Sequence, residues 1–277
     1  MGEAVAIIAG GGALPAHLAR GLAASSTPFL IAQIEGGAME NPDDWPVLTF
    51  ALERLVPLFD HLHERDVGRV VLAGAVTRPR LDPERIDART AQLLPRILPA
   101  LGQGDDATLR AVIALFEDEG FAVIGADAVA PDLLPPPGVP TRVEPGPADR
   151  KDAERAARIV AALGTADVGQ GAVVAQGLCL AVETLPGTDA MLDWVAQVAG
   201  ASRPDPKGAR GVFFKAPKPG QERRVDLPAI GPGTVESAHR AGLAGIAVEA
   251  GGVMVLNAAA TVARADDRGL FLWVRDG

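Results

Sequence analysis

The first half of the chain alternates short apolar runs with longer segments of helical spacing. Four apolar runs have the length and composition of β-strands, at residues 4–9, 29–34, 69–73 and 121–124. Segments with apolar residues at three- and four-residue intervals alternate with them, at 14–24, 52–65, 88–100 and 107–119. Strands separated by helices are typical of parallel βαβ units. The pattern therefore predicts an α/β fold that begins with a Rossmann-like N-terminal domain containing a parallel sheet.

A proline-rich stretch interrupts this alternation near the middle of the chain. The prolines between 135 and 147 are Pro135, Pro136, Pro137, Pro140, Pro145 and Pro147. Proline fixes φ and has no N–H to donate to a sheet, so the stretch predicts a stiff, extended linker. We expect an N-terminal domain over 1–134, a linker over 135–147 and a C-terminal domain over 148–277.

The second half has a different order of elements, with strand runs that follow one another more closely. Strands are expected at 172–175, 178–183, 212–215, 245–248, 253–256 and 270–274, and helices at 149–163, 190–199, 235–241 and 258–265. Gly177 and the pair Gly251-Gly252 lie where two hairpins would turn. The pattern predicts a mixed α/β C-terminal domain with some adjacent antiparallel strands.

The composition of the chain excludes some classes of function. The 277 residues are 48% hydrophobic and carry a formal charge of −9, which argues against a protein that binds the nucleic-acid backbone. An anionic ligand would need a local cluster of cations, and Lys215 and Lys218 supply the first indication of one. Cys179 is the single cysteine, as expected of a reducing compartment. Glu3 stands where a signal peptide would need positive charge, so we expect a cytoplasmic protein.

A glycine triplet follows the first predicted strand. Gly10, Gly11 and Gly12 stand between this strand and the first helix, where backbone amides can bind phosphate, and Glu35 ends the second strand. The dinucleotide-binding pattern fails at Pro15, which replaces its third glycine. A tight turn without ligand, a phosphate or sugar contact, and an NAD site all remain open.

The segment 214–231 concentrates cations in an otherwise acidic chain. Lys215, Lys218 and Arg224 can neutralise phosphate charge, and Asp226 follows them between apolar residues. Prolines on both sides of Lys218 stiffen the loop, which lowers the entropy lost on binding. A carboxylate at 226 could orient Mg²⁺ or a water beside a pyrophosphate. The alternative is a salt-bridged loop with a structural aspartate.

Two other segments contain candidate ligands. Glu183 ends a predicted strand and Asp189 begins the next helix, so both are candidate partners for a metal or for sugar hydroxyls, with Thr188 a plausible helix cap. Arg78 follows the third strand, where open α/β sheets gather ligands, although a solvated arginine explains it equally well. The sequence contains neither the motif set of two-metal phosphoesterases nor a Nudix helix.

Ordered blocks along nearly the whole chain resemble one family, the two-domain UDP-2,3-diacylglucosamine pyrophosphatases of lipid A biosynthesis. The blocks include Ile7–Pro15, Val76-Thr77-Arg78-Pro79, Gly104-Asp105-Asp106, Asp167-Val168-Gly169-Gln170, Gly187-Thr188-Asp189, Lys218-Pro219-Gly220-Gln221, Arg224-Val225-Asp226-Leu227-Pro228 and Thr234-Val235. Glu222 departs from the aspartate typical of the family, and Leu185-Pro186 replaces a more usual acidic residue.

The resemblance implies hydrolysis of UDP-2,3-diacylglucosamine to UMP and 2,3-diacylglucosamine 1-phosphate, with Mg²⁺ or another divalent cation as cofactor. It implies a homodimer that contacts the inner surface of the inner membrane transiently. The expected catalytic residues are Asp226, Lys215, Lys218 and Arg224. The expected substrate-binding residues are Gly10, Gly11, Gly12, Thr77, Arg78, Gln170, Thr188, Gln221 and Thr234. The expected metal ligands are Asp189, Glu183 and Asp226.

Two other classes of function are compatible with the residues alone. One is a protein that binds a lipid or a nucleotide-sugar without chemistry, since a cationic loop serves binding as well as catalysis. The other is a nicotinamide-dependent oxidoreductase built on the glycine triplet and Glu35, against which Pro15 argues.

Overall fold

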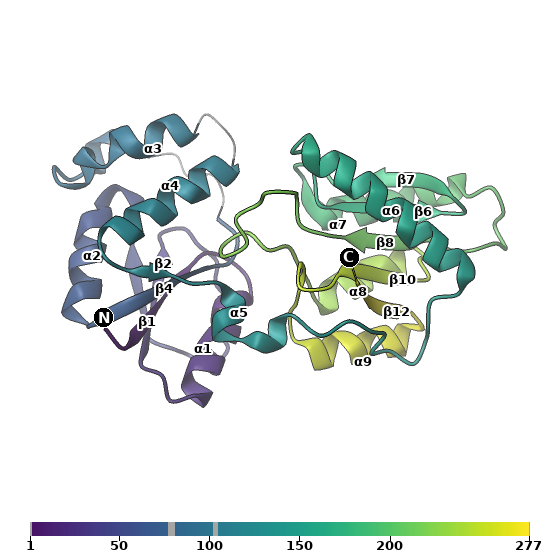
Figure 1. The fold of residues 1–277 in the computed structure, drawn as a ribbon, viewed down its shortest axis with the longest axis horizontal. Helices are drawn as coiled ribbons and strands as arrows, with labels where there is room; N and C mark the ends of the chain where they lie inside the picture. The colour runs from purple at the N-terminus through teal and green to yellow at the C-terminus, as the bar shows by residue number, and fades with distance from the viewer. Residues whose placement is uncertain (1, 77–80, 102–104, 277) are drawn as a thin grey trace. The chain divides into compact units, whose positions relative to one another are not determined.

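The computed structural model describes residues 2–76, 81–101 and 105–276. It contains two compact units (Figure 1). The first comprises Met1–Pro131 together with Glu222–Asp226, and the second comprises Asp132–Gln221 together with Leu227–Gly277. None of the helices that the structure describes has the length and apolar character needed to cross a membrane.

The first unit is built on a five-stranded sheet whose order is β3-β2-β1-β4-β5, with every pair parallel. Its strands are β1 (Ala4–Ala9), β2 (Phe29–Ile34), β3 (Val47–Phe50), β4 (Val67–Ala73) and β5 (Ala122–Val123). The order reverses between β1 and β4, so the carboxyl ends of these strands form the topological switch point of a Rossmann-like sheet. The fold class predicted for the first half is confirmed.

The helices of the first unit cover this sheet. They are α1 (Leu14–Ala24), α2 (Leu55–Glu64), α3 (Leu94–Leu101), α4 (Asp105–Asp118) and α5 (Ala126–Val129), with short 3₁₀ helices at Leu52–Arg54, Pro83–Arg85 and Thr90–Gln92. The core between α2, α4 and the sheet contains an aromatic cluster. The rings of Phe59 and Phe116 meet edge to face with centroids 5.1 Å apart, and Phe121 packs against both.

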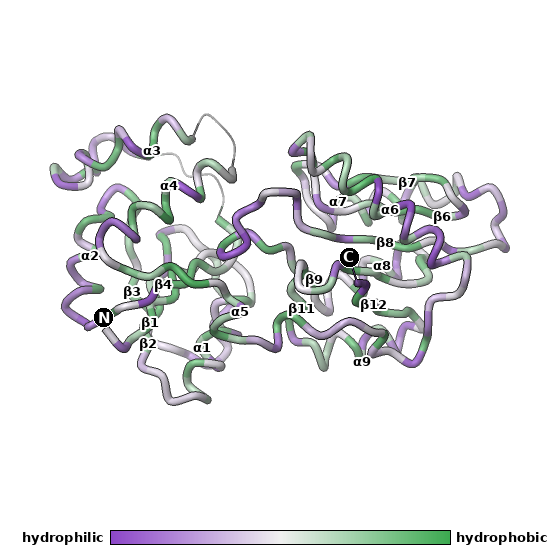
Figure 2. Tube along the Cα trace, viewed as in Figure 1, coloured by the Kyte–Doolittle hydropathy of each residue, from purple (hydrophilic) through white to green (hydrophobic). Residues whose placement is uncertain are grey.

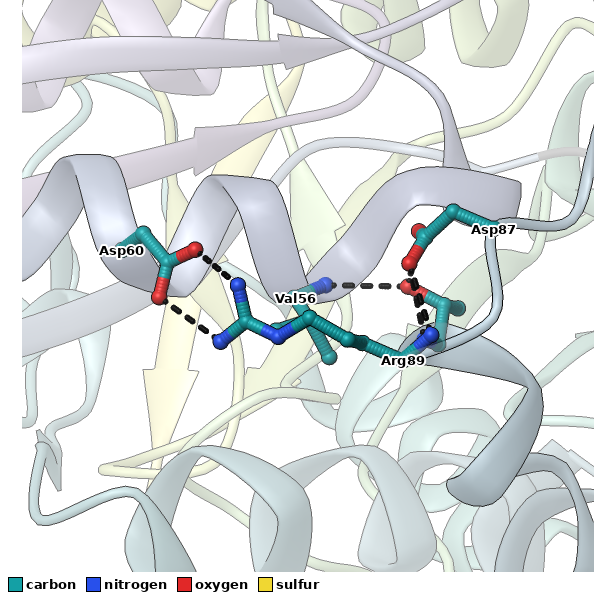
Figure 3. Close-up of polar contacts among 5 residues, drawn as sticks. Val56, Asp60, Asp87 and Arg89 are labelled. Carbon is teal, nitrogen blue, oxygen red and sulfur yellow. Dashed lines mark hydrogen bonds and ion pairs between the residues drawn. The ribbon is translucent and has the colours of Figure 1, made fainter.

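A polar network fixes the segment before α3 onto α2 (Figure 3). Arg89 forms a two-pronged ion pair with Asp60 of α2, at 2.5 and 3.0 Å. The buried Thr90 hydroxyl donates to Asp87 at 2.6 Å and accepts from the amide of Val56 at 3.1 Å. The Thr90 hydrogen bond lowers the pKa of the Asp87 carboxyl. These contacts hold the residues from Asp87 to Thr90 against α2.

The second unit has a five-stranded mixed sheet of order β12-β10-β8-β6-β7. Its strands are β6 (Gly171–Ala175), β7 (Leu178–Val182), β8 (Val212–Lys215), β10 (Gly245–Glu249) and β12 (Phe271–Arg275). The three strands β8, β10 and β12 are parallel, whereas β6 runs antiparallel to both β8 and β7. A separate pair, β9 (Ala229–Ile230) and β11 (Met254–Val255), is parallel. The mixed α/β class predicted for this half is confirmed.

The two faces of this sheet have separate cores because side chains alternate along each strand. Phe213 of β8 packs with helices α7 (Gly187–Gln197), α8 (Pro232–Arg240) and α9 (Ala258–Arg268) on one face. Phe214 packs on the other face, against α6 (Pro147–Thr165). Figure 2 shows the strands of both units as largely hydrophobic, while the loop that follows β8 is hydrophilic.

Three strand assignments differ from the sequence-based expectation. The strand β3 was not predicted, since it is a four-residue edge strand preceded by polar residues. The two-residue strand β9 was also not predicted. The expected hairpin at Gly251-Gly252 is wrong, because β10 has parallel neighbours on both edges and β11 pairs with β9 instead. The hairpin at Gly177 is confirmed by the antiparallel pairing of β6 with β7.

The segment 135–147 is extended, as its prolines imply, and it is attached to the second unit. The amide of Gly138 donates to Val274 O at 2.9 Å, and the amide of Val274 donates back to Gly138 O at 2.8 Å. The amide of Leu272 also donates to the buried Thr141 hydroxyl at 3.0 Å. The segment therefore adds a short strand-like contact to the outer edge of β12.

Candidate active site

A buried lysine is the centre of the best-defined polar group in the second unit. Lys215 ends β8 with 6% of its surface exposed. Its ammonium group donates to Thr188 Oγ1 at 2.6 Å and lies 3.7 Å from Glu183 Oε2. Because β6 runs antiparallel between β7 and β8, the residues that end β7 and β8 meet at the same edge of the sheet. The structure thus brings together Lys215, Thr188 and Glu183, which the sequence places in two separate segments.

Glycines create the space in which Glu183 lies. The amide of Glu183 donates to Gly171 O at 2.8 Å. A Cβ at Gly171 would meet Glu183 Oε2 at 2.6 Å, and a Cβ at Gly169 would clash with the Glu183 carbonyl oxygen. Gly187 then starts α7 with a φ of +87°, a conformation that favours glycine. This turn places Thr188 and Asp189 in the first turn of α7, beside Lys215.

The electrostatics of this group are unusual for a protein interior. Burial lowers the pKa of Lys215, while the charges of Glu183 and Asp189 raise it. Glu183 Oε2 is buried and receives no hydrogen bond within the described part of the chain. Asp189 accepts a hydrogen bond from the hydroxyl of Ser237 at 3.3 Å. A cation at the N-terminus of α7 provides a favourable environment for phosphate oxygens.

Lys218 belongs to a second, neighbouring group in the same unit. Gln221 Oε1 accepts from the amide of Lys218 at 2.9 Å and from Gln170 Nε2 at 2.8 Å, which closes the loop 218–221. The ammonium group of Lys218 pairs with Asp167 at 2.6 Å. Gln170 and Gln221, both expected to bind substrate, therefore hold the cationic loop in shape. The sequence did not identify Asp167 as the partner of Lys218, although Asp167 belongs to one of the matched blocks.

Arg224 and Asp226 belong to the first unit, not to the unit of Lys215 and Lys218. Arg224 forms two hydrogen bonds to Glu222, both at 3.0 Å, and a third to Glu117 at 2.7 Å. The hydrogen bonds to Glu222 and then to Glu117 raise the pKa of Arg224, and Arg224 lowers that of Glu222. Val225 packs against the core of the first unit. The segment Glu222–Asp226 is thus anchored on both sides of Arg224.

The glycine triplet has a structural explanation. The amides of Gly10, Gly11 and Gly12 donate to the carbonyl oxygens of Ala73, Ala75 and Ala38, at 2.8, 2.7 and 3.0 Å. A Cβ at Gly10 would meet the Ala75 carbonyl oxygen at 2.5 Å, so glycine permits the close approach of the loops that follow β1 and β4. These three amides therefore have protein acceptors. Substrate binding at these glycines stays a prediction, and a phosphate contact through their amides would compete with these backbone acceptors.

The second feature behind the nicotinamide hypothesis, Glu35, also has a partner within the protein. The carboxylate of Glu35 forms an ion pair with Arg85 at 2.5 Å, so it is already engaged by a cation. A dinucleotide fold needs this acid for the ribose hydroxyls and the glycine amides for the pyrophosphate. In this structure both groups have partners within the protein, which argues against the oxidoreductase hypothesis.

The remaining expected ligands have varied positions. Thr234 Oγ1 accepts from the amide of Gly231 at 3.2 Å and caps α8. Thr77 and Arg78 lie outside the described residues. Within the described residues, no group of three or more histidine, cysteine, aspartate or glutamate side chains could hold a metal ion. The metal ligands expected from the sequence are divided between the units, with Glu183 and Asp189 in the second and Asp226 in the first.

Both units match models of one family. Residues 4–133 match the LpxI N-terminal domain and residues 136–273 match the LpxI C-terminal domain. Since these matches together cover most of the chain, the chain belongs to the LpxI family of two-domain α/β proteins. The family expected from the sequence blocks is thereby confirmed.

A curated relative agrees with this assignment. The UDP-2,3-diacylglucosamine pyrophosphatase LpxI of Caulobacter vibrioides is 42% identical over 266 residues, which cover 96% of this chain and 95% of the relative. The similarity therefore spans both units.

Proposed function

We propose that the protein hydrolyses UDP-2,3-diacylglucosamine to UMP and 2,3-diacylglucosamine 1-phosphate, a step of lipid A biosynthesis. The end-to-end similarity to the Caulobacter vibrioides pyrophosphatase carries the proposal. In the reaction, one water oxygen forms a bond to a phosphorus of the pyrophosphate, and the bond from that phosphorus to the bridging oxygen breaks. The protons of the water leave with the two phosphate products or pass to solvent.

The group around Lys215 supports this chemistry. A pyrophosphate diester carries two negative charges, and catalysis of its cleavage depends on stabilising the charge that develops on the phosphate oxygens. Lys215 offers a buried ammonium group already held toward Thr188, at the start of α7. Lys218, which pairs with the exposed Asp167, can exchange this partner for a phosphate oxygen. Asp226 is proposed to orient the attacking water.

The decisive experiment is an assay of the purified full-length protein with UDP-2,3-diacylglucosamine. We expect stoichiometric release of UMP and of 2,3-diacylglucosamine 1-phosphate, separated by chromatography and identified by mass. UDP-N-acetylglucosamine, which has the same pyrophosphate but no second acyl chain, serves as the control substrate. Retention of the lipid without UMP release would contradict the hydrolase and support the binding protein instead.

A divalent cation, expected to be Mg²⁺, is part of the proposal. The described residues do not form a three-ligand metal site, so we assign no step to a resident metal. Mg²⁺ commonly binds to one or two carboxylates together with substrate phosphates, and Glu183 and Asp189 are the carboxylates beside Lys215. We expect EDTA to abolish UMP release and Mg²⁺ in excess to restore it. Full activity in EDTA would exclude the metal dependence.

Two physical associations complete the proposal. The acyl chains of the substrate suggest transient contact with the inner surface of the inner membrane, and the family resemblance suggests a homodimer. Flotation with vesicles containing the substrate should carry part of the protein upward, and light scattering should give twice the mass of 28.5 kDa. If no protein floats with the vesicles, the proposed membrane contact is wrong. If light scattering gives the mass of one chain, the proposed homodimer is wrong.

A further inference from the structure

A cavity of about 430 Å³ lies in the second unit, on the opposite face of the sheet from Lys215. Its walls include Gly138, Arg150, the last residues of β12 from Trp273 to Arg275, and Asp276, which follows the strand. Trp273 packs with the α6-side core, as does Phe214, whereas Phe213 packs on the other face. Lys215 has the same orientation as Phe213 because side chains alternate along a strand. The volume falls within the range of small-molecule sites.

The cavity has a rigid wall. The pair of backbone hydrogen bonds between Gly138 and Val274 fixes the segment 135–147 against the edge of β12. Arg150, in the first turns of α6, donates through Nε to Pro145 O at 3.2 Å, and its guanidinium carbon lies 4.9 Å from the centre of the Trp273 ring. Stacking on an aromatic ring holds a guanidinium group flat and leaves its outer nitrogens directed outward.

The two arginines of this cavity have no carboxylate partner among the described residues. Arg85, Arg89 and many others pair with carboxylates. Among the residues that the structure describes, Arg150 and Arg275 form no ion pair, and Arg275 lies over the ring of Phe214 with its guanidinium carbon 6.0 Å from the ring centre. The carboxylate of Asp276 also lines the cavity. In a chain of net charge −9, Arg150 and Arg275 therefore give this cavity two positive charges that no ion pair within the described part of the chain neutralises.

We propose that this cavity binds the phosphate group of a small phosphate monoester through the guanidinium groups of Arg150 and Arg275. A phosphate monoester carries close to two negative charges near neutral pH, which matches two guanidinium groups. Arginine forms paired hydrogen bonds with phosphate oxygens, and such charge-assisted bonds are stronger than neutral ones. The negative charge of Asp276 would repel the phosphate and therefore lowers the affinity of the cavity for it.

The test uses the full-length protein and the indole N–H signals of its three tryptophans in a nitrogen-15 correlation spectrum. Trp273→Phe assigns the signal of the cavity. The probes are inorganic phosphate, UMP, and phosphatidylcholine vesicles with or without phosphatidic acid, which separate a free phosphate, a nucleotide and a lipid headgroup. We expect the Trp273 signal to shift saturably with at least one probe, with no parallel shift at Trp45 or Trp194 for inorganic phosphate.

Variants decide whether the two arginines are responsible. Arg150→Gln and Arg275→Gln should each weaken the binding of the responding probe roughly 10-fold or more. Arg158→Gln, which removes the same charge from an exposed position of α6, should leave binding unchanged. Asp276→Asn should tighten binding, an effect that misfolding cannot imitate. The proposal is overturned if no probe shifts Trp273, or if the double variant Arg150→Gln/Arg275→Gln binds as tightly as the wild type.

Discussion

Replacing Asp226 with asparagine is expected to lower kcat for UMP release roughly 10²–10⁴-fold while leaving the fold intact. Asparagine keeps the shape of the side chain and removes its charge, so the variant isolates the ability of the carboxylate to orient or deprotonate water. The main chain of Asp226 is held by hydrogen bonds to Glu222 O, from its own amide at 3.1 Å and from that of Val225 at 3.2 Å. The position is therefore fixed by contacts that the substitution does not remove.

The control for this variant is Asp118→Asn, which removes one carboxylate from an exposed position in the first unit. It should retain wild-type kcat. Circular dichroism and thermal unfolding of both variants should match the wild type, which separates a chemical effect from a structural one. A wild-type kcat for Asp226→Asn would rule out the proposed role of this carboxylate.

Replacing Lys215 with methionine should lower kcat/KM roughly 10²–10³-fold, the effect typical of losing one group that stabilises developing charge. Methionine fills the same buried volume, but it leaves Glu183 without the cation 3.7 Å away. A buried charge without a partner is destabilising, so the single variant should also unfold at a lower temperature. Steady-state kinetics and thermal unfolding measure the two effects on the same preparation.

A second substitution separates these effects. Lys215→Met/Glu183→Gln removes both charges and should recover much of the stability without recovering activity. Lys151→Met, at an exposed position of α6, is the matched control and should behave as the wild type. If the double variant regained wild-type kcat/KM, Lys215 would be a structural cation and the proposed role in charge stabilisation would be wrong.

The sequence identified most elements of the fold because the apolar pattern of each is local. The strands β1 and β2 and the helix α1 have the predicted bounds. The errors occur where a partner strand decides the structure. β3 is short and lies at a sheet edge. The runs 245–248 and 253–256 are strands as predicted, but their pairing as a hairpin is wrong, because nothing local shows that β10 already has neighbours on both edges.

The segments that contain the candidate site residues could be predicted from the sequence, but the contacts between these residues could not. Glu183 and Thr188 were marked by their positions at the end of a strand and the start of a helix, and Lys215 was marked by the cluster of cations to which it belongs. That Lys215 donates to Thr188, 27 positions away, depends on the order of strands in the sheet. The pairing of Arg224 with Glu117 spans 107 positions and has no local signal. The glycine triplet left its role open in the sequence, because glycine serves close backbone packing as readily as phosphate binding.

The assignment of Glu222–Asp226 to the first unit means that neither half of this gene product is independent. A fragment ending at the boundary near residue 134 would lose the side chain that covers part of its core, Val225, and would leave Glu117 without its arginine. A C-terminal fragment that starts near residue 135 would contain Glu222–Asp226 but not the residues of the first unit that they contact. A chimera that joins the halves of two related proteins would therefore need an α4 from one protein that fits the segment Glu222–Asp226 of the other, about a hundred residues downstream.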